Sequence, residues 1–439
     1  MEWSTRKRGR RSTLVFHSSL AASCCFLGLH RKLISLQTTA RALTPHHDDA
    51  RAINELVEYV LSPWRQRGGV YKVEVDAALA VNKTQDAACF MVQNINGQLY
   101  TVGSADTRPD GPVWNPGRLF RTRRENILQF LQRAVDKKQL LNFEATFCLH
   151  DCVVSQSRST SNSMFGTQYE YTPDPIPAFT VVSCIDSMNI PFPTWDYATG
   201  AFSKWQSKID EIVSEASKHP WNSRKSQAVF RGGQRSCVLY PKVGTREKGV
   251  PFYRVLEKDG ENAKKCGRNA MLYRALTSDS FRLFNVRLTD GVDVLKFGHK
   301  LRKLPDEPRF LRKSVQETFK YQIIAEGECQ WANRLRQALF MGTVLIIQDN
   351  QCVEYYGLNL RPWQHYIPVD YWFTNLTDAV VWAEKNPDTV VEMNTAKQMY
   401  ARRYLSPVNV DLYVMELMQR YASMLRYEVL LRPGAVKVD

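Results

Sequence analysis

The chain has 439 residues, of which 44% are hydrophobic and 11% aromatic, and its formal net charge is +15. This length and apolar content predict a large packed core in two lobes of ordinary domain size, and they exclude a disordered or collagen-like chain. The basic excess favours an anionic partner such as a phosphate, nucleotide, nucleic acid or acidic glycan, and the alternative is a solvated basic surface.

The first 44 residues resemble a targeting segment. The basic run Arg6–Arg11 precedes a mildly apolar stretch, Ser12–Leu29. This order is typical of a secretory signal peptide or of a type II signal anchor that crosses the membrane once, while the Arg- and Ser-rich composition also fits an organelle transit peptide. We expect a protein of the secretory pathway (ER lumen or Golgi), soluble or anchored, with an N-terminal lobe at 45–220 and a C-terminal lobe at 221–439.

Helices and strands are expected to alternate along the rest of the chain. The spacing of apolar residues predicts helices at 50–66, 123–138, 202–219, 331–340, 378–386 and 410–427. Runs of β-forming residues bounded by turns predict a hairpin around Asn96-Gly97 and strands at 141–150, 175–184, 226–233, 320–327 and 342–349. Residues 240–280 are polar and show only a weak pattern. The alternation indicates an α/β fold with parallel sheets.

A His-Asp pair stands between two cysteines in the stretch EATFCLHDCVV, where Cys148 and Cys152 flank His150 and Asp151. Neighbouring residues of a strand point to opposite faces, so the two are not expected to pair directly. A zinc site would need a fourth ligand and a thiol nucleophile would need a nucleophile turn, and neither is visible. The ten cysteines of the chain are scattered without a CxxC pair, which fits disulfides or buried thiols.

One segment of the C-terminal half combines a strand end with a cation. An apolar strand ends at Glu326-Gly327, and a helix beginning near Trp331 carries Asn333 and Arg334 in its first turn. Free N–H groups at a helix start, together with an arginine, can bind an anion such as a pyrophosphate at the carboxyl ends of the strands. The alternative is an arginine on a solvated helix face.

The stretch AVFRGG also combines a strand end with a cation. A strand runs into Arg231, Gly232 and Gly233, and Arg235 follows two residues later. Glycines let the backbone approach a ligand closely, and the forked guanidinium matches phosphate oxygens. An ordinary tight turn would also use Gly-Gly.

Together these motifs resemble glycosyltransferase family 90, which includes protein O-glucosyltransferases and capsule-associated xylosyltransferases. The specific block is KYQIIAEG…RLRQALFMGTVLIIQ…EYYGLNLRPWQHYIPV, and SQAVFRGG, NFEATFCLHD and IPFPTWDYA match in order, over about residues 50–430. The resemblance implies a GT-B architecture, in which two Rossmann-like lobes hold a nucleotide-sugar in the cleft between them. It also implies inverting transfer from a UDP-sugar to a hydroxyl, with no metal and no other cofactor.

The resemblance also assigns roles to residues. Asp151 matches the general base. The donor-binding positions are Arg231, Gly232, Arg235, Glu326, Gly327, Trp331, Asn333 and Arg334, and the acceptor-binding positions are Pro193, Trp195 and Tyr197. The spacings before Arg334 and after the FRG motif depart from the family by one residue, and the stretch 152–174 is longer than expected, which favours an unusual acceptor.

This chemistry is coherent with the residue types. A carboxylate can take the proton of an acceptor hydroxyl as the new bond forms, and arginines can stabilise the UDP leaving group without a metal. We expect glucose or xylose as the sugar and a protein or glycan as the acceptor. The alternatives are a catalytically inactive protein that binds a glycan or a nucleotide-sugar, and a basic nucleic-acid-binding protein. No nucleic-acid-binding module is visible, so nucleic acid is not an expected partner.

Overall fold

Two sheets organise the part of the chain that the structure, a computed structural model, describes. The described residues are 47–84, 89–102, 116–149, 176–184, 188–195, 202–233, 237–239, 253–255, 267–289, 308–327, 334–350 and 352–438. All of them belong to one unit, Pro45–Asp439. The expected targeting segment 1–44 and the pair His150-Asp151 therefore lie outside the described residues.

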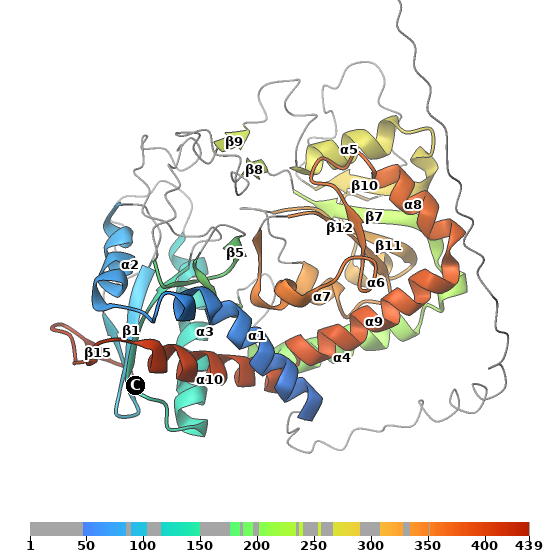
Figure 1. The fold of residues 1–439 in the computed structure, drawn as a ribbon. Coiled ribbons are helices and arrows are strands. Elements are labelled where there is room, and N and C mark those ends of the chain that lie inside the picture. Colours follow the sequence, from blue (N-terminus) through green and yellow to red (C-terminus); the bar gives the residue numbers. More distant parts are fainter. Residues whose placement is uncertain are drawn as a thin grey trace, which may run out of the picture. The chain divides into compact units, whose positions relative to one another are not determined.

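The first sheet has mixed strand directions (Figure 1). Its described strands, in spatial order, are β15 (Val436–Lys437), β2 (Gln98–Val102), β1 (Cys89–Ile95), β3 (Phe143–Cys148), β4 (Ala178–Thr180) and β6 (Ile190–Pro191). The pairs from β15 to β3 are antiparallel, whereas β3, β4 and β6 run parallel. Asn96 and Gly97 form the turn between β1 and β2 with φ of 51° and 84°, which confirms the predicted Asn-Gly hairpin.

The α/β class expected from the sequence is confirmed, but the parallel order expected of both lobes is only partly present in this sheet. A two-residue turn such as that between β1 and β2 can join only antiparallel strands. The predicted strand 175–184 is also divided, into β4 and β5 (Ser183–Cys184). β5 leaves the first sheet and pairs with β13 (Cys352–Val353).

The second sheet is parallel throughout its described length. Its strands, in spatial order, are β10 (Phe284–Leu288), β7 (Lys225–Gly232), β11 (Phe319–Ile324), β12 (Val344–Gln348) and β14 (Ile367–Val369). The chain begins at β7, passes to β10 on one side, and then continues through β11 on the other side. Such a reversal leaves a crevice outside the carboxyl ends of the strands where it occurs, here β7 and β11.

Both faces of the second sheet are covered. Ile323 and Ile346 join one hydrophobic cluster, while their neighbours Ile324 and Leu345 join another, as the alternation of side chains along a strand requires. Among the helices that contribute to these clusters are α5 (Gly267–Thr277), α7 (Leu335–Ala338), α8 (Leu376–Lys385) and α9 (Pro387–Leu405). Burial on both faces explains why β12 is apolar over its first four residues, Val344 to Ile347.

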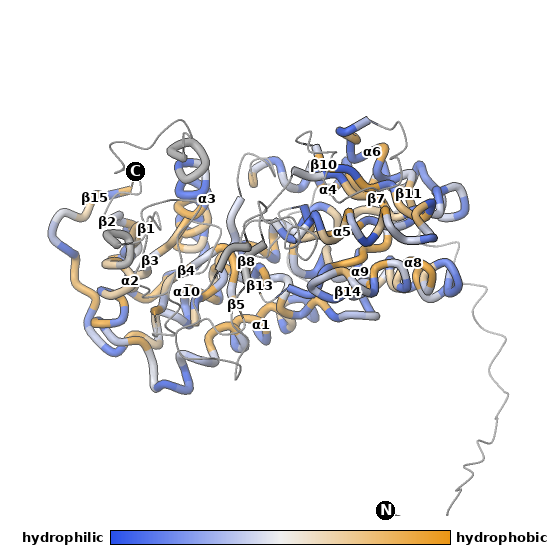
Figure 2. The backbone as a smooth tube through the Cα atoms, turned by 90° about the horizontal axis from the view of Figure 1, so that it is seen from above, coloured by the Kyte–Doolittle hydropathy of each residue, from blue (hydrophilic) through white to orange (hydrophobic). Residues whose placement is uncertain are grey.

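The end of the chain returns to the first sheet. The other described helices are α1 (His47–Gln66), α2 (Lys72–Thr84), α3 (Pro116–Lys137), α4 (Trp205–Ser217), α6 (Lys313–Gln316) and α10 (Pro407–Met424). Helix α10 contacts α1, α3 and β3, and β15 pairs with β2. Residues beyond 406 thus pack on the first sheet, although they follow the boundary expected near residue 220. Figure 2 shows hydrophobic and hydrophilic residues alternating along α1, the pattern from which this helix was predicted.

No helix within the described ranges is long and apolar enough to span a bilayer. The expected membrane anchor belongs to residues 1–44 and stays a prediction. The remaining short elements are β8 (Cys237–Leu239), β9 (Tyr253–Val255), η1 (Phe202–Lys204), η2 (Trp221–Ser223), η3 (Phe281–Leu283) and η6 (Tyr355–Asn359).

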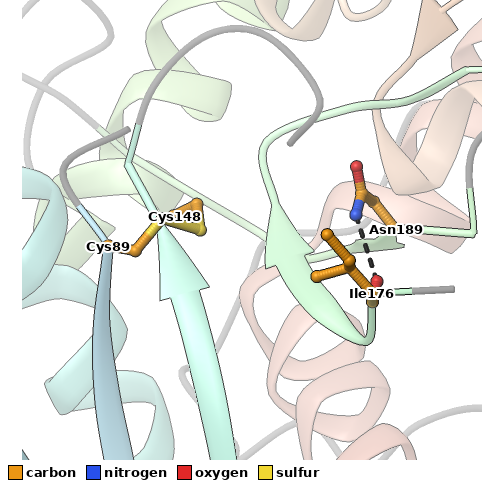
Figure 3. The surroundings of a disulfide bond; sticks show 4 residues. All are labelled: Cys89, Cys148, Ile176 and Asn189. Atoms are coloured by element: carbon orange, nitrogen blue, oxygen red, sulfur yellow. Dashed lines mark hydrogen bonds between the residues drawn. A yellow bond between two sulfur atoms is a disulfide. The ribbon is translucent and has the colours of Figure 1, made fainter. Parts of the chain in front are cut away.

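Two disulfides join residues far apart in the sequence. Cys89 and Cys148 are bonded across β1 and β3 (Figure 3), and Cys184 and Cys352 are bonded across β5 and β13. Cys148 is therefore neither a zinc ligand nor a free thiol, while Cys152 lies outside the described residues. The second bond links segments on either side of residue 220.

Lys397 of α9 is a buried amine that ties this helix to the end of α7 and to the turn before β12. Its side chain has no exposed surface, and its Nζ donates to the carbonyl oxygens of Ala338, Met341 and Thr343 at 3.3, 2.7 and 2.6 Å. Burial lowers the pKa of Lys397 to about 7, against the opposing effect of the Glu317 carboxylate. The folded state consequently binds this proton less tightly than the unfolded chain does.

Replacing Lys397 should change how stability depends on pH. Because its pKa is lower in the folded state, the unfolded chain binds more protons between pH 7 and 10, and the free energy of unfolding should rise with pH over this window. The slope is on the order of 1 kcal/mol per pH unit. Urea unfolding at pH 7 and pH 9 should show this gain for the natural chain and for Lys385→Met on the exposed surface, and lose it for Lys397→Met. An equal gain in all three would contradict the assignment.

Candidate active site

The carboxyl ends of β7 and β11 bring together the predicted donor-side residues that the structure describes. Arg231 and Gly232 end β7, while Glu326 and Gly327 follow β11. These two strands are neighbours in the parallel sheet, at the point where the strand order reverses. The crevice that this topology leaves is the ordinary position of a ligand site in an open α/β sheet.

Arg334 enters this crevice from the start of α7. Its Nη1 donates to the carbonyl oxygen of Arg231, and its guanidinium carbon lies 4.6 Å from the centre of the Phe230 ring. Such a short approach requires glycine at 232, because a Cβ there would lie 2.4 Å from Nη2 of Arg334. The side chain is half-buried.

Arg268 is a second cation at this place, and the sequence reasoning missed it. The Nε of Arg268 donates to the carbonyl oxygen of Glu326 at 2.8 Å, and its Nη1 donates to that of Gly233. Its guanidinium carbon lies 5.6 Å from the Phe230 ring centre. The signal was a glycine directly before an arginine and an apolar run: Gly267, with φ of 61°, begins α5 inside the stretch that had shown only a weak pattern.

Arg231 has a different part in this cluster. Its side chain is only 6% exposed, and it donates to Asn285 twice, at 2.7 Å to the carbonyl oxygen and at 2.6 Å to Oδ1. A third bond, 3.1 Å long, goes from its Nε to the carbonyl oxygen of Pro308. The guanidinium of Arg231 therefore holds β7 to β10 and to the segment before α6, and its backbone carbonyl orients Arg334.

Glu326 is fully buried and held by the two strands beyond β11. Its backbone N donates to Oε1 of Gln348 at 2.8 Å, and its carboxylate accepts from the hydroxyl of Tyr371 at 3.1 Å to each oxygen. Gln348 in turn donates to the carbonyl oxygen of Tyr371 at 2.8 Å. Tyr371 was not predicted; its position just after β14 was the only sequence signal. The result is one carboxylate fixed beside the arginine cluster.

Of the predicted acceptor-side residues, the two that the structure describes lie in the interior. Pro193 is buried, and Trp195 has no exposed surface. The Trp195 ring centre lies 5.7, 4.8 and 5.6 Å from those of Phe130, Phe202 and Trp205. The rings of this segment thus pack the core, and direct contact between Trp195 and an acceptor stays a prediction.

Other predicted positions fall outside the described residues: Asp151, Tyr197, Arg235, Trp331 and Asn333. Strand β3 ends at Cys148, three residues before Asp151, so the strand that leads to the predicted base is present. The expected helix 331–340 is described only as α7, a single turn at Leu335–Ala338. The positive charge seen at the crevice therefore comes from arginine side chains. Within the described ranges, no three His, Cys, Asp or Glu side chains are grouped as metal ligands.

The sequence profile described as Glycosyl transferase family 90 matches residues 54–240 and 262–439, which include all the described crevice residues. The chain belongs to glycosyl transferase family 90. As a family 90 chain, it has the crevice residues Arg231, Gly232, Glu326 and Arg334 inside the matched segments.

Several family 90 relatives are similar to this chain at low identity. It is 22% identical to protein O-glucosyltransferase 3 of Rattus norvegicus over 269 residues, which cover 61% of this chain and 46% of the relative. It is 21% identical to protein O-glucosyltransferase 1 of Homo sapiens over 269 residues, which cover 59% of this chain and 60% of the relative. It is 30% identical to protein O-glucosyltransferase 2 of Danio rerio over 121 residues, which cover 28% of this chain and 24% of the relative. The chain thus spans about half the length of the curated relatives it matches.

Gly232→Ala should disturb the crevice without removing a charge. The new methyl group would overlap Nη2 of Arg334 at 2.4 Å and displace it from the Arg231 carbonyl. We expect UDP, the leaving group that the resemblance implies, to bind roughly tenfold more weakly, because one charge-assisted contact is lost. Isothermal titration calorimetry measures this change.

A double substitution is the matched control for this overlap. In an Arg334→Ala background the overlapping group is gone, so Gly232→Ala should weaken UDP binding much less than in the natural chain. Additive losses of affinity would show that Gly232 does not act through Arg334.

Proposed function

We propose that this family 90 chain transfers a sugar from a UDP-sugar to a hydroxyl of a protein or glycan acceptor, with inversion at the anomeric carbon. The observation that supports this most strongly is the group of Arg268, Arg334 and Arg231 around Gly232, at the switch point of a parallel sheet. Such a position suits the diphosphate of a nucleotide-sugar. Glucose and xylose, which differ by one hydroxymethyl group, are the candidate sugars.

The donor side supplies positive charge. When the glycosidic bond to UDP breaks, the leaving phosphate gains negative charge, and fixed guanidinium groups can stabilise it. Arg334 is half-buried, and Arg268 is held rigidly between the Glu326 and Gly233 carbonyls, so neither needs to reorganise far. Forked guanidinium groups match phosphate oxygens in geometry as well as in charge. This arrangement supports a mechanism without a metal.

The acceptor side requires a base. A hydroxyl is a poor nucleophile at neutral pH, and a carboxylate within hydrogen-bond reach can take its proton as it attacks. Asp151 is our candidate for this group, because it comes three residues after the end of β3 in the sequence and matches the base that the family resemblance implies. Asp151 would take the proton of the acceptor hydroxyl as the hydroxyl oxygen attacks the anomeric carbon from one face, while UDP leaves from the opposite face. This displacement would invert the configuration at the anomeric carbon.

The acceptor and the compartment follow from separate observations. The named relatives are protein O-glucosyltransferases, which supports a protein hydroxyl as the acceptor, with a glycan as the other candidate. Disulfides form and persist in oxidising compartments, and Cys89–Cys148 and Cys184–Cys352 are both bonded. With the basic and apolar N-terminus, they support a protein of the ER lumen or Golgi, soluble or anchored by its first residues.

Asp151→Asn tests the proposed function. Loss of the base should lower kcat at least about a hundredfold, because general-base catalysis contributes roughly that much or more. The affinity for UDP should stay within about twofold, because the proposed donor contacts come from α5 and from the residue just before α7, next to the ends of β7 and β11. The measurements are UDP release from UDP-glucose and UDP-xylose with a folded cysteine-rich domain as acceptor, and calorimetric UDP binding. Full activity of this variant would refute the base.

Arginine variants complete this comparison. Arg334→Ala should weaken UDP binding, whereas Arg282→Ala, which removes an exposed arginine just before β10 at the opposite end of the sheet, should not. A natural chain that binds UDP but transfers no sugar would favour the inactive, nucleotide-sugar-binding alternative.

A further inference from the structure

Helix α7 carries two arginines that reach in different directions. Arg334, just before the helix, contacts the end of β7, while Arg336 contacts the segment that follows β6. Residues two apart on a helix point about 200° apart around its axis, so these two side chains leave opposite sides of the turn. The same single turn is therefore bonded both to the donor crevice and to the predicted acceptor segment, 193–195.

Arg336 contacts the segment 193–195 through a hydrogen bond and through a cation–π contact. Its Nη1 donates to the carbonyl oxygen of Thr194 at 2.7 Å, and its guanidinium carbon lies 4.0 Å from the centre of the Trp195 ring. The side chain is 1% exposed, and its charge is balanced by an ion pair with Glu354, which also accepts from the hydroxyl of Tyr356. The contact is thus buried from solvent, its charge is neutralised by Glu354, and its hydrogen bond fixes the orientation of the Thr194 carbonyl.

Asn126 of helix α3 binds the next backbone carbonyl of this segment, that of Trp195. Asn126 is 7% exposed, and its Nδ2 donates to the carbonyl oxygen of Trp195 at 3.1 Å and to that of Thr122 at 2.7 Å. One turn further along α3, Phe130 packs against the Trp195 ring. Successive carbonyls of the segment, at 194 and 195, are therefore held from two different helices.

We propose that Arg336 and Asn126 are positioning residues that fix the acceptor segment 193–195 relative to the helix that carries Arg334. This inference rests on the proposed function, and it gives the buried Trp195 a role: the ring anchors the segment and does not touch the acceptor. A buried ion pair such as Arg336–Glu354 stabilises a fold no better than apolar side chains of similar size. What it adds here is a defined distance between the donor crevice and the segment 193–195.

Asn126→Ala is the first test, because it removes no charge. Loss of one hydrogen bond to the segment should raise the acceptor KM roughly tenfold. The donor KM and UDP affinity should stay within about twofold, since the crevice contacts are untouched. Gln129→Ala, at an exposed position of the same helix, is the matched control and should change neither KM.

Arg336 needs a variant that does not leave Glu354 buried and unpaired. The double variant Arg336→Met with Glu354→Gln removes the grip and both charges together, and it should raise the acceptor KM at least as much as Asn126→Ala. Arg336→Lys keeps the charge but lacks the planar fork, and it should recover part of the loss. Equal changes in donor and acceptor KM, or no change in either, would overturn the positioning role.

Hydrogen exchange gives a readout that does not depend on catalysis. Amides in peptides covering 188–195 should exchange faster in Asn126→Ala and in the Arg336–Glu354 double variant, while peptides of β7 and β11 keep their rates. Unchanged exchange at 188–195 would overturn the proposal. If the natural chain transfers no sugar, the proposed function fails, and the exchange rates still decide whether these residues hold the segment.

Discussion

The close approach of Arg334 to the glycine at the end of β7 is the constraint on which the charged crevice depends. With no Cβ at Gly232, the guanidinium can reach the Arg231 carbonyl and lie over the Phe230 ring. Arg268 approaches the same ring from α5. Cationic groups can be placed this closely only where their neighbours are carbonyl oxygens and an aromatic face, both of which attract positive charge. The parallel order of β7 and β11 puts all of these groups at one edge of the sheet.

The parts of the fold that the sequence predicted are those with a local signal. Strands β7, β11 and β12 are apolar runs bounded by polar or glycine residues, and Asn96-Gly97 specifies its turn through positive φ at both positions. Strand direction and order have no local signal, so the mixed first sheet and the return of β15 to β2 could not be predicted. Helix α5 was missed because its few apolar residues follow a polar stretch.

The residues of the candidate site also fall into two groups: those that a sequence motif indicates, and those that only the folded chain brings together. Arg231, Gly232, Glu326 and Arg334 were found through motifs, and the structure brings them to one crevice. Their separate roles depend on tertiary structure: Arg231 binds Asn285 with its side chain, whereas the half-buried Arg334 binds the Arg231 carbonyl at the end of β7. Arg268 and Tyr371 are important only because distant segments place them beside Glu326. Trp195 shows the converse, since a tryptophan in a loop motif proved to be a core residue held by α3 and α7.

The central claim is that the arginine crevice binds the diphosphate of a UDP-sugar without a metal. The most direct measurement is the thermal unfolding of the full chain with UDP, UDP-glucose, UDP-xylose or GDP-mannose, each with and without EDTA. A ligand at a hundred times its Kd stabilises the folded state by about 2.7 kcal/mol, which raises Tm measurably. The account predicts that the UDP compounds raise Tm with or without EDTA, while GDP-mannose, which carries a diphosphate on another base, shows how much of the increase the diphosphate alone contributes. No increase with any UDP compound, or an increase that EDTA abolishes, would contradict it.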